Sequence, residues 1–531
     1  MSRLGLVLGL LWLAHAAVLA DETLSHRQLL QTAQSIRRQQ LEKHCYTLAD
    51  DALEGRRAGT RGGRTAANYI RNHLARWGYQ GAGDEGDYYQ LFLDGYRNIL
   101  ALLPGSHPRL KHEVVLLGAH YDHVGYGTPR TSLGPIGYIH NGADDNASGT
   151  AVVLEVARAL AQLPRPPRRS VLIVFWDAEE LGLLGSEHWC RRPTLPLRRI
   201  KAAINCDMLG RLRPQGLQVL AWRSGGSLRR RVLWSNRHTG LPLRFSWELK
   251  RNSDHYPLLQ HQVPVVMFHT GLHSDYHRPS DDADKLNYSA LERIARLVFL
   301  TTVALAEAEQ LPSFRPQVFQ EMSPPPAMAA ALVPPPARLG LSWRSGTSEP
   351  GALVLEVTPG SPAARAGLRP GCRILQAAGR TLRQADQLFT LVQRCPKKLL
   401  LRWRTAKGEE TTRVVTLAGK PFRIGIAWRP DPLDPQVMVL SRVLADSPAA
   451  QAGLRPGDRI YAAQGKLIRS SQAFKRLLDQ AQQPVELLVE RKGRLVPMLV
   501  RPWRLIPLQE QFSDQLPLVA PEAGAALRKA G

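Results

Sequence analysis

The sequence predicts an α/β protein: a three-layer α/β/α domain with a mostly parallel sheet, followed by two small β-rich domains. Between residues 22 and 307, short apolar runs alternate with helical patterns, as strands alternate with covering helices around a parallel sheet. Residues 308–337 contain two proline clusters around an alanine run, which is typical of a linker. Beyond them the chain repeats itself, which predicts tandem domains.

The first residues have the pattern of an export signal. Arg3 precedes an apolar stretch, and small residues surround Ala20, so we expect a signal peptide over 1–20 and an exported protein, periplasmic or secreted. No later apolar run approaches the roughly 20 residues that cross a bilayer, so we expect no transmembrane segment.

The elements of the first domain, 22–307, follow from runs of apolar residues. The part up to about residue 80 has helical patterns with a glycine-rich loop between them. Continuous apolar runs then predict strands with both faces covered. These runs are 98–105, 113–120, 171–176, 200–208 and 263–270, and long helices are expected over 147–163 and 290–310.

An internal repeat defines the rest of the chain. The segment SPAARAGLRPGCRI at 361–374 recurs as SPAAQAGLRPGDRI at 447–460, an offset of 86 residues, and a glycine loop precedes each copy. We therefore predict two domains, 338–419 and 422–505. The remaining residues, 506–531, are rich in Ala, Pro and charge and are expected to form a disordered tail.

The charge distribution and the cysteine content argue against a nucleic-acid-binding protein and against a zinc site built from thiolates. The formal net charge is +25, but its arginines are scattered, with no dense tract and no aromatic platform. We expect a solvated, arginine-rich surface and no specific nucleic-acid partner. The five cysteines match no thiolate zinc motif and are expected to be small buried hydrophobes. Cys372 and Cys395 lie in one predicted domain, and whether they pair stays open.

Polar side chains follow each predicted strand of the first domain. Ligands in open α/β sheets collect at the carboxyl ends of the strands, so these side chains should share one edge. Any one of them could be a satisfied buried polar group, and adjacent glutamates could simply begin a helix. The set is His120, Asp122, Asp144, Asp145, Glu179, Glu180, Asp207 and His277.

So many buried carboxylates would repel one another unless cations lay between them. Imidazole and carboxylate ligands without thiolates fit two catalytic Zn(II) ions, with Co(II) or Mn(II) as possible substitutes. If Glu180 binds metal, its neighbour Glu179 is free to take a proton from a water between the metals and to pass it to a leaving amine. The sequence therefore predicts metal-assisted hydrolysis of an amide.

Five motifs carry a resemblance to a known family: GAHYDH, GADDNASG, FWDAEELGLLGS, INCDMLG and DYHRPSDDADK, which lie in family order between about 95 and 300. They resemble the secreted co-catalytic dizinc aminopeptidases related to the Vibrio and Streptomyces leucine aminopeptidases. The resemblance implies a zinc exopeptidase fold with one metal on His120 and Asp207, the other on Glu180 and His277, and Asp145 bridging.

The same resemblance implies further roles. Glu179 would be the general base and acid, Asp122 would orient a metal-binding histidine, and Tyr276 would hydrogen-bond the oxyanion. The Asp145–Asn146 peptide bond would be cis. The loop 126–140 is longer than in compact family members, so we expect it to shape the substrate pocket.

The repeats resemble PDZ domains of bacterial periplasmic proteases, whose loop amides bind a peptide C-terminus. Cys372 replaces the aspartate that the second copy has as Asp458. The domains could also serve only as spacers or dimer contacts. The peptide-binding loops RLGL and RIGI would contribute Leu339, Gly340, Leu341, Ile424, Gly425 and Ile426.

The sequence thus predicts an exported zinc-dependent aminopeptidase that acts on peptides or proteins, with PDZ domains that bind peptide C-termini or regulate access. Two alternatives remain open. One is a dizinc carboxypeptidase or aminoacylase, and the other is a PDZ-based adaptor with a non-catalytic hydrolase domain.

Overall fold

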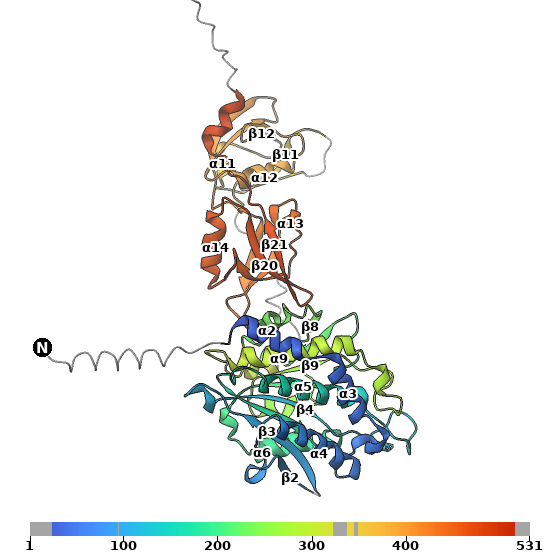
Figure 1. Cartoon of the computed structure of the whole chain (residues 1–531). Helices are drawn as coiled ribbons and strands as arrows, with labels where there is room; N and C mark the ends of the chain where they lie inside the picture. Colours follow the sequence, from blue (N-terminus) through green and yellow to red (C-terminus); the bar gives the residue numbers. More distant parts are fainter. Residues whose placement is uncertain (1–23, 94, 322–336, 345–348, 516–531) are drawn as a thin grey trace, which may run out of the picture. The chain divides into compact units, whose positions relative to one another are not determined.

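The computed structural model describes residues 24–93, 95–321, 337–344 and 349–515. The expected signal peptide lies outside the described residues, as do 322–336 of the expected linker and 516–531 of the expected tail. The chain divides into two compact units (Figure 1), one of them Met1–Pro325 with Lys492–Leu495, the other Pro326–Arg491 with Val496–Gly531.

A nine-stranded sheet forms the centre of the first unit, in the order β1-β3-β5-β4-β6-β9-β7-β8 with β2 beside β3. Its central strands β5, β4, β6 and β9 are parallel, and antiparallel pairs β3–β5 and β7–β9 flank them. The predicted mostly parallel sheet is confirmed. The strands are β1 Gln80–Gly81, β2 Tyr89–Phe92, β3 Tyr96–Leu103, β4 Val114–His120, β5 Ser170–Trp176, β6 Ile200–Cys206, β7 Leu217–Leu220, β8 Leu243–Phe245 and β9 Val265–His269.

Helices pack on this sheet in two groups. Helices α5 and α9 contact each other and β4, while α6 and α8 contact each other, with α8 also on β6 and β9. Alternate side chains of β4 and β5, such as Leu116 and Val174, lie in one apolar cluster with Trp189 of α6. Side chains alternate along a strand, so the others face α5 and α9 and complete three layers. The helices are α2 His26–Ser35, α3 Arg38–Leu48, α4 Arg61–Arg76, α5 Gly149–Ala161, α6 Leu184–Arg191, α7 Leu228–Asn236, α8 His255–Gln260 and α9 Tyr288–Ala306.

The second unit holds two six-stranded sheets with the same strand order, β10-β11-β12-β14-β15 and β16-β17-β18-β20-β21, each with one further short strand. Matching serines cap matching helices, because Ser361 Oγ accepts from Ala364 N and Ser447 Oγ accepts from Ala450 N, each at 3.2 Å. The internal repeat therefore folds twice in the same way. The elements are β10 Leu341–Trp343, β11 Ala352–Val357, α11 Pro362–Ala366, β12 Arg373–Ala377, β13 Arg380–Thr381, α12 Gln387–Arg394, β14 Lys398–Arg404, β15 Glu410–Thr416, β16 Ile426–Pro430, β17 Met438–Val443, α13 Pro448–Gln451, β18 Arg459–Ala463, β19 Lys466–Leu467, α14 Ser471–Gln480, β20 Val485–Arg491 and β21 Arg494–Val500.

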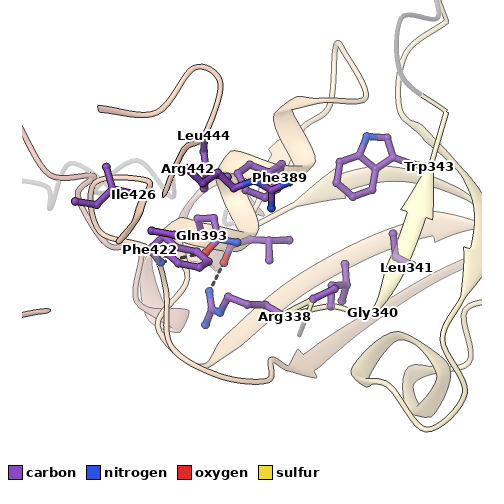
Figure 2. A pocket seen from close by; sticks show the side chains of 14 residues that line it. Arg338, Gly340, Leu341, Trp343, Phe389, Gln393, Phe422, Ile426, Arg442 and Leu444 are labelled. Atoms are coloured by element: carbon purple, nitrogen blue, oxygen red, sulfur yellow. Dashed lines mark hydrogen bonds between the residues drawn. The ribbon is translucent and has the colours of Figure 1, made fainter. Parts of the chain in front are cut away.

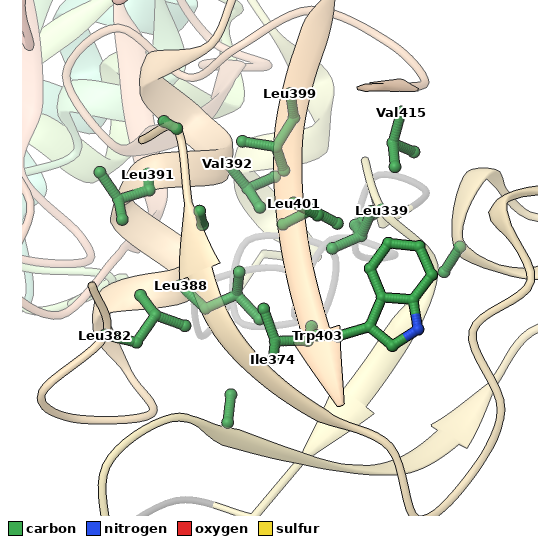
Figure 3. Close-up of a cluster of buried hydrophobic side chains, with 14 of the residues drawn as sticks. Leu339, Ile374, Leu382, Leu388, Leu391, Val392, Leu399, Leu401, Trp403 and Val415 are labelled. Carbon is green, nitrogen blue, oxygen red and sulfur yellow. The ribbon is translucent and has the colours of Figure 1, made fainter. Parts of the chain in front are cut away.

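The first repeat has its own apolar core (Figure 3), in which Leu388 of α12 packs with Leu401 and Trp403 of β14. Cys372 and Cys395 lie in this core as free thiols. All five cysteines are free and buried, as expected of small apolar side chains.

The linker expected over 308–337 is wrong in its first part. Residues 316–319 form a 3₁₀ helix, η9 Pro316–Phe319, and Val318 is fully buried in the same cluster as the sheet residues of the first unit. Phe314 and Phe319 pack against that cluster. The prolines of this segment are close in sequence to Phe314, Val318 and Phe319. Burial of these apolar side chains stabilises an ordered structure although the composition is typical of a linker.

The disordered tail expected over 506–531 is likewise wrong at its start. Ile506 belongs to the core of the first repeat, and a 3₁₀ helix, η10 Leu508–Gln515, follows it. The side chain of Gln511 is buried, accepts from Leu400 N at 2.7 Å and donates to the Lys398 carbonyl at 3.0 Å. These bonds pair backbone groups of β14. None of the described helices has the length and apolar character needed to cross a membrane.

Candidate metal centre

The predicted site residues meet at the carboxyl edge of the parallel strands. His120 ends β4, Glu179 and Glu180 follow β5, and Asp207 follows β6. Asp145 lies in the tight turn before α5. The expected cis peptide bond between Asp145 and Asn146 is present.

Ligand-type atoms gather there in two groups, each with its atoms within 4.8 Å of one another. Asp145 lies between the groups, because one carboxylate oxygen is 3.4 Å from His120 Nε2 and the other is 3.1 Å from His277 Nε2. The five predicted ligands are therefore brought together. The groups are His120, Glu179 and Asp207 on one side, and His123, Asp145, Glu180 and His277 on the other.

The chemistry of these side chains fits divalent metal ions. The Nε2 atoms of His123 and His277 are buried and have no hydrogen bond of normal geometry among the described residues. His277 Nε2 instead lies 3.0 Å from a carboxylate oxygen of Glu180. Imidazole nitrogens that face carboxylates around a common centre, with no thiolate, form the donor set that catalytic zinc prefers.

Asp122 supports the two glutamates as well as the histidine. Its carboxylate is fully buried and accepts from the amides of Glu179 (3.1 Å) and Glu180 (3.3 Å). A carboxylate oxygen also lies 3.7 Å from His120 Nδ1. One aspartate therefore fixes the backbone of both acids relative to His120, a wider role than the sequence suggested.

The adjacent glutamates have opposite electrostatic environments. Burial raises the pKa of Glu179 well above its ordinary value; the charge of His120 opposes this rise, whereas the carboxylate of Asp254 adds to it. Burial would also raise the pKa of Glu180, but the imidazoles of His123 and His277, with ring nitrogens 2.7 and 3.0 Å from its carboxylate oxygens, leave it below its ordinary value. Paired acids whose pKa values separate in this way are suited to different chemical roles.

Two cavities border the centre, and Glu180 lines both. One, of about 400 Å³, is also lined by Glu179 and Tyr276. The other, of about 460 Å³, is lined by His123 and by residues 128–131 of the long loop. Both cavities therefore reach the centre and offer space for a substrate beside it.

Tyr276 and the loop 126–140 border this space, as expected. The Tyr276 ring stacks on His277 at 3.9 Å between centroids, and burial raises the pKa of its phenol, which therefore stays protonated. Leu133 N donates to the His277 carbonyl at 2.9 Å, and Ser132 Oγ lies 2.8 Å from His140 Nε2. These bonds hold the loop beside the centre.

Three titratable side chains at the site were not predicted from the sequence. His123 Nδ1 lies 2.7 Å from Glu180 Oε1, and the HYDH motif gave a signal for it. The carboxylate of Asp281 accepts from the amides of Asp144 and Asp145. Asp254 is fully buried, and burial raises its pKa to about 7. Asp281 and Asp254 lie in loops, where no strand end marks them.

The glycine loops of both repeats have the same constrained geometry. Gly340 and Gly425 have φ of 76° and 79°. A Cβ on either would lie 2.2 Å from the Cβ of Ser361 or Ser447, respectively, so only glycine fits. Arg338 supports the first loop by donating to the carbonyls of Val392, Cys395 and Pro396.

Each glycine loop borders a cavity. In the first repeat the cavity is about 200 Å³ and is lined by residues 337–341 together with Phe389 and Val392 of α12 (Figure 2). Phe422 and Arg442 of the second repeat also line it. The cavity of the second repeat is about 370 Å³ and is lined by residues 421–428 and α14 side chains. All six predicted loop residues line one or both cavities.

The substitution of Cys372 for an aspartate is tolerated in the first repeat. In the second repeat, Asp458 accepts from Arg455 N at 2.9 Å and pairs with Arg491 at 2.5 Å. In the first repeat, Cys372 instead lies in the apolar core, and the strand order is unchanged.

Comparisons with known proteins agree with this geometry. Leupeptin-inactivating enzyme 1 of Streptomyces exfoliatus is 27% identical over 244 residues, which cover 45% of this chain and 49% of that protein. Aminopeptidase YwaD of Bacillus subtilis is 26% identical over 215 residues, 38% of this chain and 44% of that protein. This chain thus spans about half the length of the curated relatives it matches.

Among solved structures, the Legionella pneumophila LapA aminopeptidase has a TM-score of 0.44 at 17% identity, covering 54% of this chain and 76% of that chain. Family models give the assignment by segment. Residues 98–302 match Peptidase family M28, and residues 353–404 and 439–491 match the PDZ domain. The chain therefore carries a domain of peptidase family M28 followed by two PDZ domains.

Proposed function

We propose that this chain is an exported zinc-dependent aminopeptidase that removes N-terminal residues from peptides or proteins. The observation that carries the proposal is the meeting of two ligand groups at Asp145, with Glu179 in one of them and two cavities bordering the centre. The family match and the aminopeptidase names of relatives support the choice of reaction. His120 and Asp207 would hold one ion, and Glu180 and His277 the other.

Two zinc ions bound there would lower the pKa of a water molecule and polarise the scissile carbonyl. Glu179 takes the proton from the attacking water and delivers it to the leaving amine. Glu180, whose pKa is lowered, remains an ionised ligand. Tyr276 keeps its proton and donates a hydrogen bond to the substrate oxygen as negative charge develops on it.

The two cavities offer room for the residues on either side of the scissile bond. The cavity beside His123 is walled by the loop 126–140, so we propose that this loop helps to select one of the two side chains.

We also propose that the PDZ domains bind peptide C-termini and thereby recruit substrates or regulate access. Support comes from the two cavities beside the glycine loops, where backbone amides can donate hydrogen bonds to a carboxylate. The signal-like N-terminal sequence supports export. A role limited to spacing or dimer contacts would leave both cavities without a ligand.

The reaction is tested with one defined peptide and zinc-loaded protein, with the products identified by mass spectrometry. An aminopeptidase releases the first residue. Release of the last residue would indicate a carboxypeptidase, cleavage only of N-acyl amino acids would indicate an aminoacylase, and no hydrolysis would favour a PDZ-based adaptor.

The role of Glu179 is tested by Glu179→Gln. We expect kcat to fall by roughly 10²–10⁴-fold, the usual contribution of general acid–base catalysis, with zinc content unchanged. Glu187→Gln is the matched control, because Glu187 lies on the same segment and pairs with Arg191 at the surface. Equal activity of the two variants would refute the mechanism.

A further inference from the structure

Arg56 makes an unusual set of contacts. It is 1% exposed and ends the 3₁₀ helix η1 Asp51–Arg56. Among the described residues, its guanidinium donates hydrogen bonds to main-chain carbonyls and to no side chain. Nε donates to Tyr121 (2.9 Å), Nη1 to Leu48 (2.5 Å) and Asn141 (2.6 Å), and Nη2 to Gly142 (2.9 Å).

Those carbonyls belong to the two loops that carry metal-ligand candidates. Tyr121 directly follows His120, and Gly142 precedes the turn Ala143–Ser148 that contains Asp145. The carbonyl of Arg56 also accepts from the amide of His123 at 3.3 Å. One residue therefore connects the loop after β4 to the turn before α5.

The charge of Arg56 is also placed for the centre. Burial lowers the pKa of its guanidinium to about 10; the charges of Asp145, Asp122 and Asp281 oppose that change, and the group stays protonated at neutral pH. A buried cation without a hydrogen-bonded carboxylate is costly, so its retention calls for a function or a structural need.

We propose that Arg56 is a positioning residue for metal binding, which sets the separation between Asp145 and the histidines of the loop after β4. The proposal rests on the proposed two-metal site. Metal ligands must hold their distances within about 0.2 Å, and loss of a supporting contact typically costs about 10–100-fold in metal affinity or activity. A lysine cannot replace the guanidinium, because its single nitrogen cannot reach carbonyls on opposite sides of the fork.

The test compares Arg56→Lys and Arg56→Met with Arg169→Lys. Arg169 is a matched control: it is 2% exposed, donates to the carbonyl of Ala308 and to Glu113, and lies at the end of β5 away from the centre. Three quantities are measured: the zinc Kd by competition with a chromophoric chelator, the visible spectrum of the Co(II)-loaded protein, and the Tm without added metal.

We expect both arginine-to-lysine variants to lower the Tm, but only Arg56→Lys to raise the zinc Kd, by roughly 10–100-fold, and to alter the Co(II) spectrum. Arg56→Met should raise the Kd at least as much. A wild-type Kd and Co(II) spectrum in Arg56→Lys would overturn the proposal, since Arg56 would then serve stability alone.

Failure of Arg56→Lys to fold under conditions where Arg169→Lys folds would also overturn it, because Arg56 would then be needed by the whole fold. Wild-type protein that binds no zinc would overturn the proposed function itself, and with it the inference drawn from it. The two failures are therefore distinguishable.

Discussion

Replacing Asp122 with asparagine tests how the two glutamates are held. The Asp122 carboxylate accepts one amide with each oxygen, that of Glu179 at 3.1 Å and that of Glu180 at 3.3 Å. Asparagine has nearly the same shape but only one acceptor oxygen. Its NH₂ group would face one of the two backbone N–H donors, so one hydrogen bond is lost and two donors are opposed.

The size of the effect follows from these contacts. A hydrogen bond to a charged acceptor contributes about 1.5–3 kcal/mol, and the amide left unpaired is partly buried. Burial raises the pKa of Asp122, so a neutral side chain avoids part of the cost of burying a charge. We therefore expect Asp122→Asn to lower the free energy of unfolding by about 1–2 kcal/mol. Displacement of Glu179 should lower kcat by roughly 10–100-fold.

Urea unfolding measures the first quantity, and hydrolysis of leucine p-nitroanilide by zinc-loaded protein measures the second. Asp84→Asn is the control, because Asp84 also accepts a backbone amide, that of Leu91 at 2.8 Å, but lies exposed and away from the centre. Wild-type kcat in Asp122→Asn at full zinc occupancy would refute the idea that Asp122 holds Glu179 in place.

Further predictions concern metal, thiols, acid and the glycine loops. Removal of metal with a chelator should lower the Tm, and added zinc should restore it, as differential scanning calorimetry would show. Ellman's reagent should find no reactive thiol in the native protein and five after unfolding, since burial raises the pKa of Cys190 to about 12 and of Cys395 to about 11. Burial lowers the pKa of His255 from 6.5 to about 4, so the unfolded chain binds more protons between these values, and the free energy of unfolding should decrease as the pH is lowered through this range; His255→Gln should flatten this slope in urea titrations. Gly425→Ala should lower the Tm, because its Cβ would meet Ser447, whereas Gly457→Ala, at a similar positive φ in open space, should lower it less.

Much of the catalytic domain could be predicted because strong local signals coincide with the site. Strand β5 is buried along its whole length, so its apolar run is continuous, and Glu179 and Glu180 follow directly. Because the carboxyl ends of parallel strands share one edge of the sheet, the polar residues after the separate strands could be predicted to form one site. The division of roles between the two glutamates stays a prediction, and their environments differ, because the pKa of Glu179 is raised and that of Glu180 is lowered.

Residues in loops were harder to find, for a physical reason. Asp281 and Asp254 reach the centre through turns whose path depends on packing, not on local periodicity. Arg56 was overlooked because an arginine in a glycine-rich segment is usually solvated, and its burial depends on carbonyls distant in sequence. The composition around Val318 and Gln511 predicted a linker and a disordered tail, but both segments are ordered. One buried side chain in each segment packs or hydrogen-bonds to a domain, and an average over a polar or proline-rich segment does not detect it.

The return of η10 to the first repeat has a consequence for biosynthesis. Ile506 and Gln511 complete the core and an edge of the first repeat, yet the ribosome makes them only after the whole second repeat. Domains usually fold in order as the chain emerges. Here the earlier domain cannot reach its final packing before the later one has been made, so the two repeats must mature together.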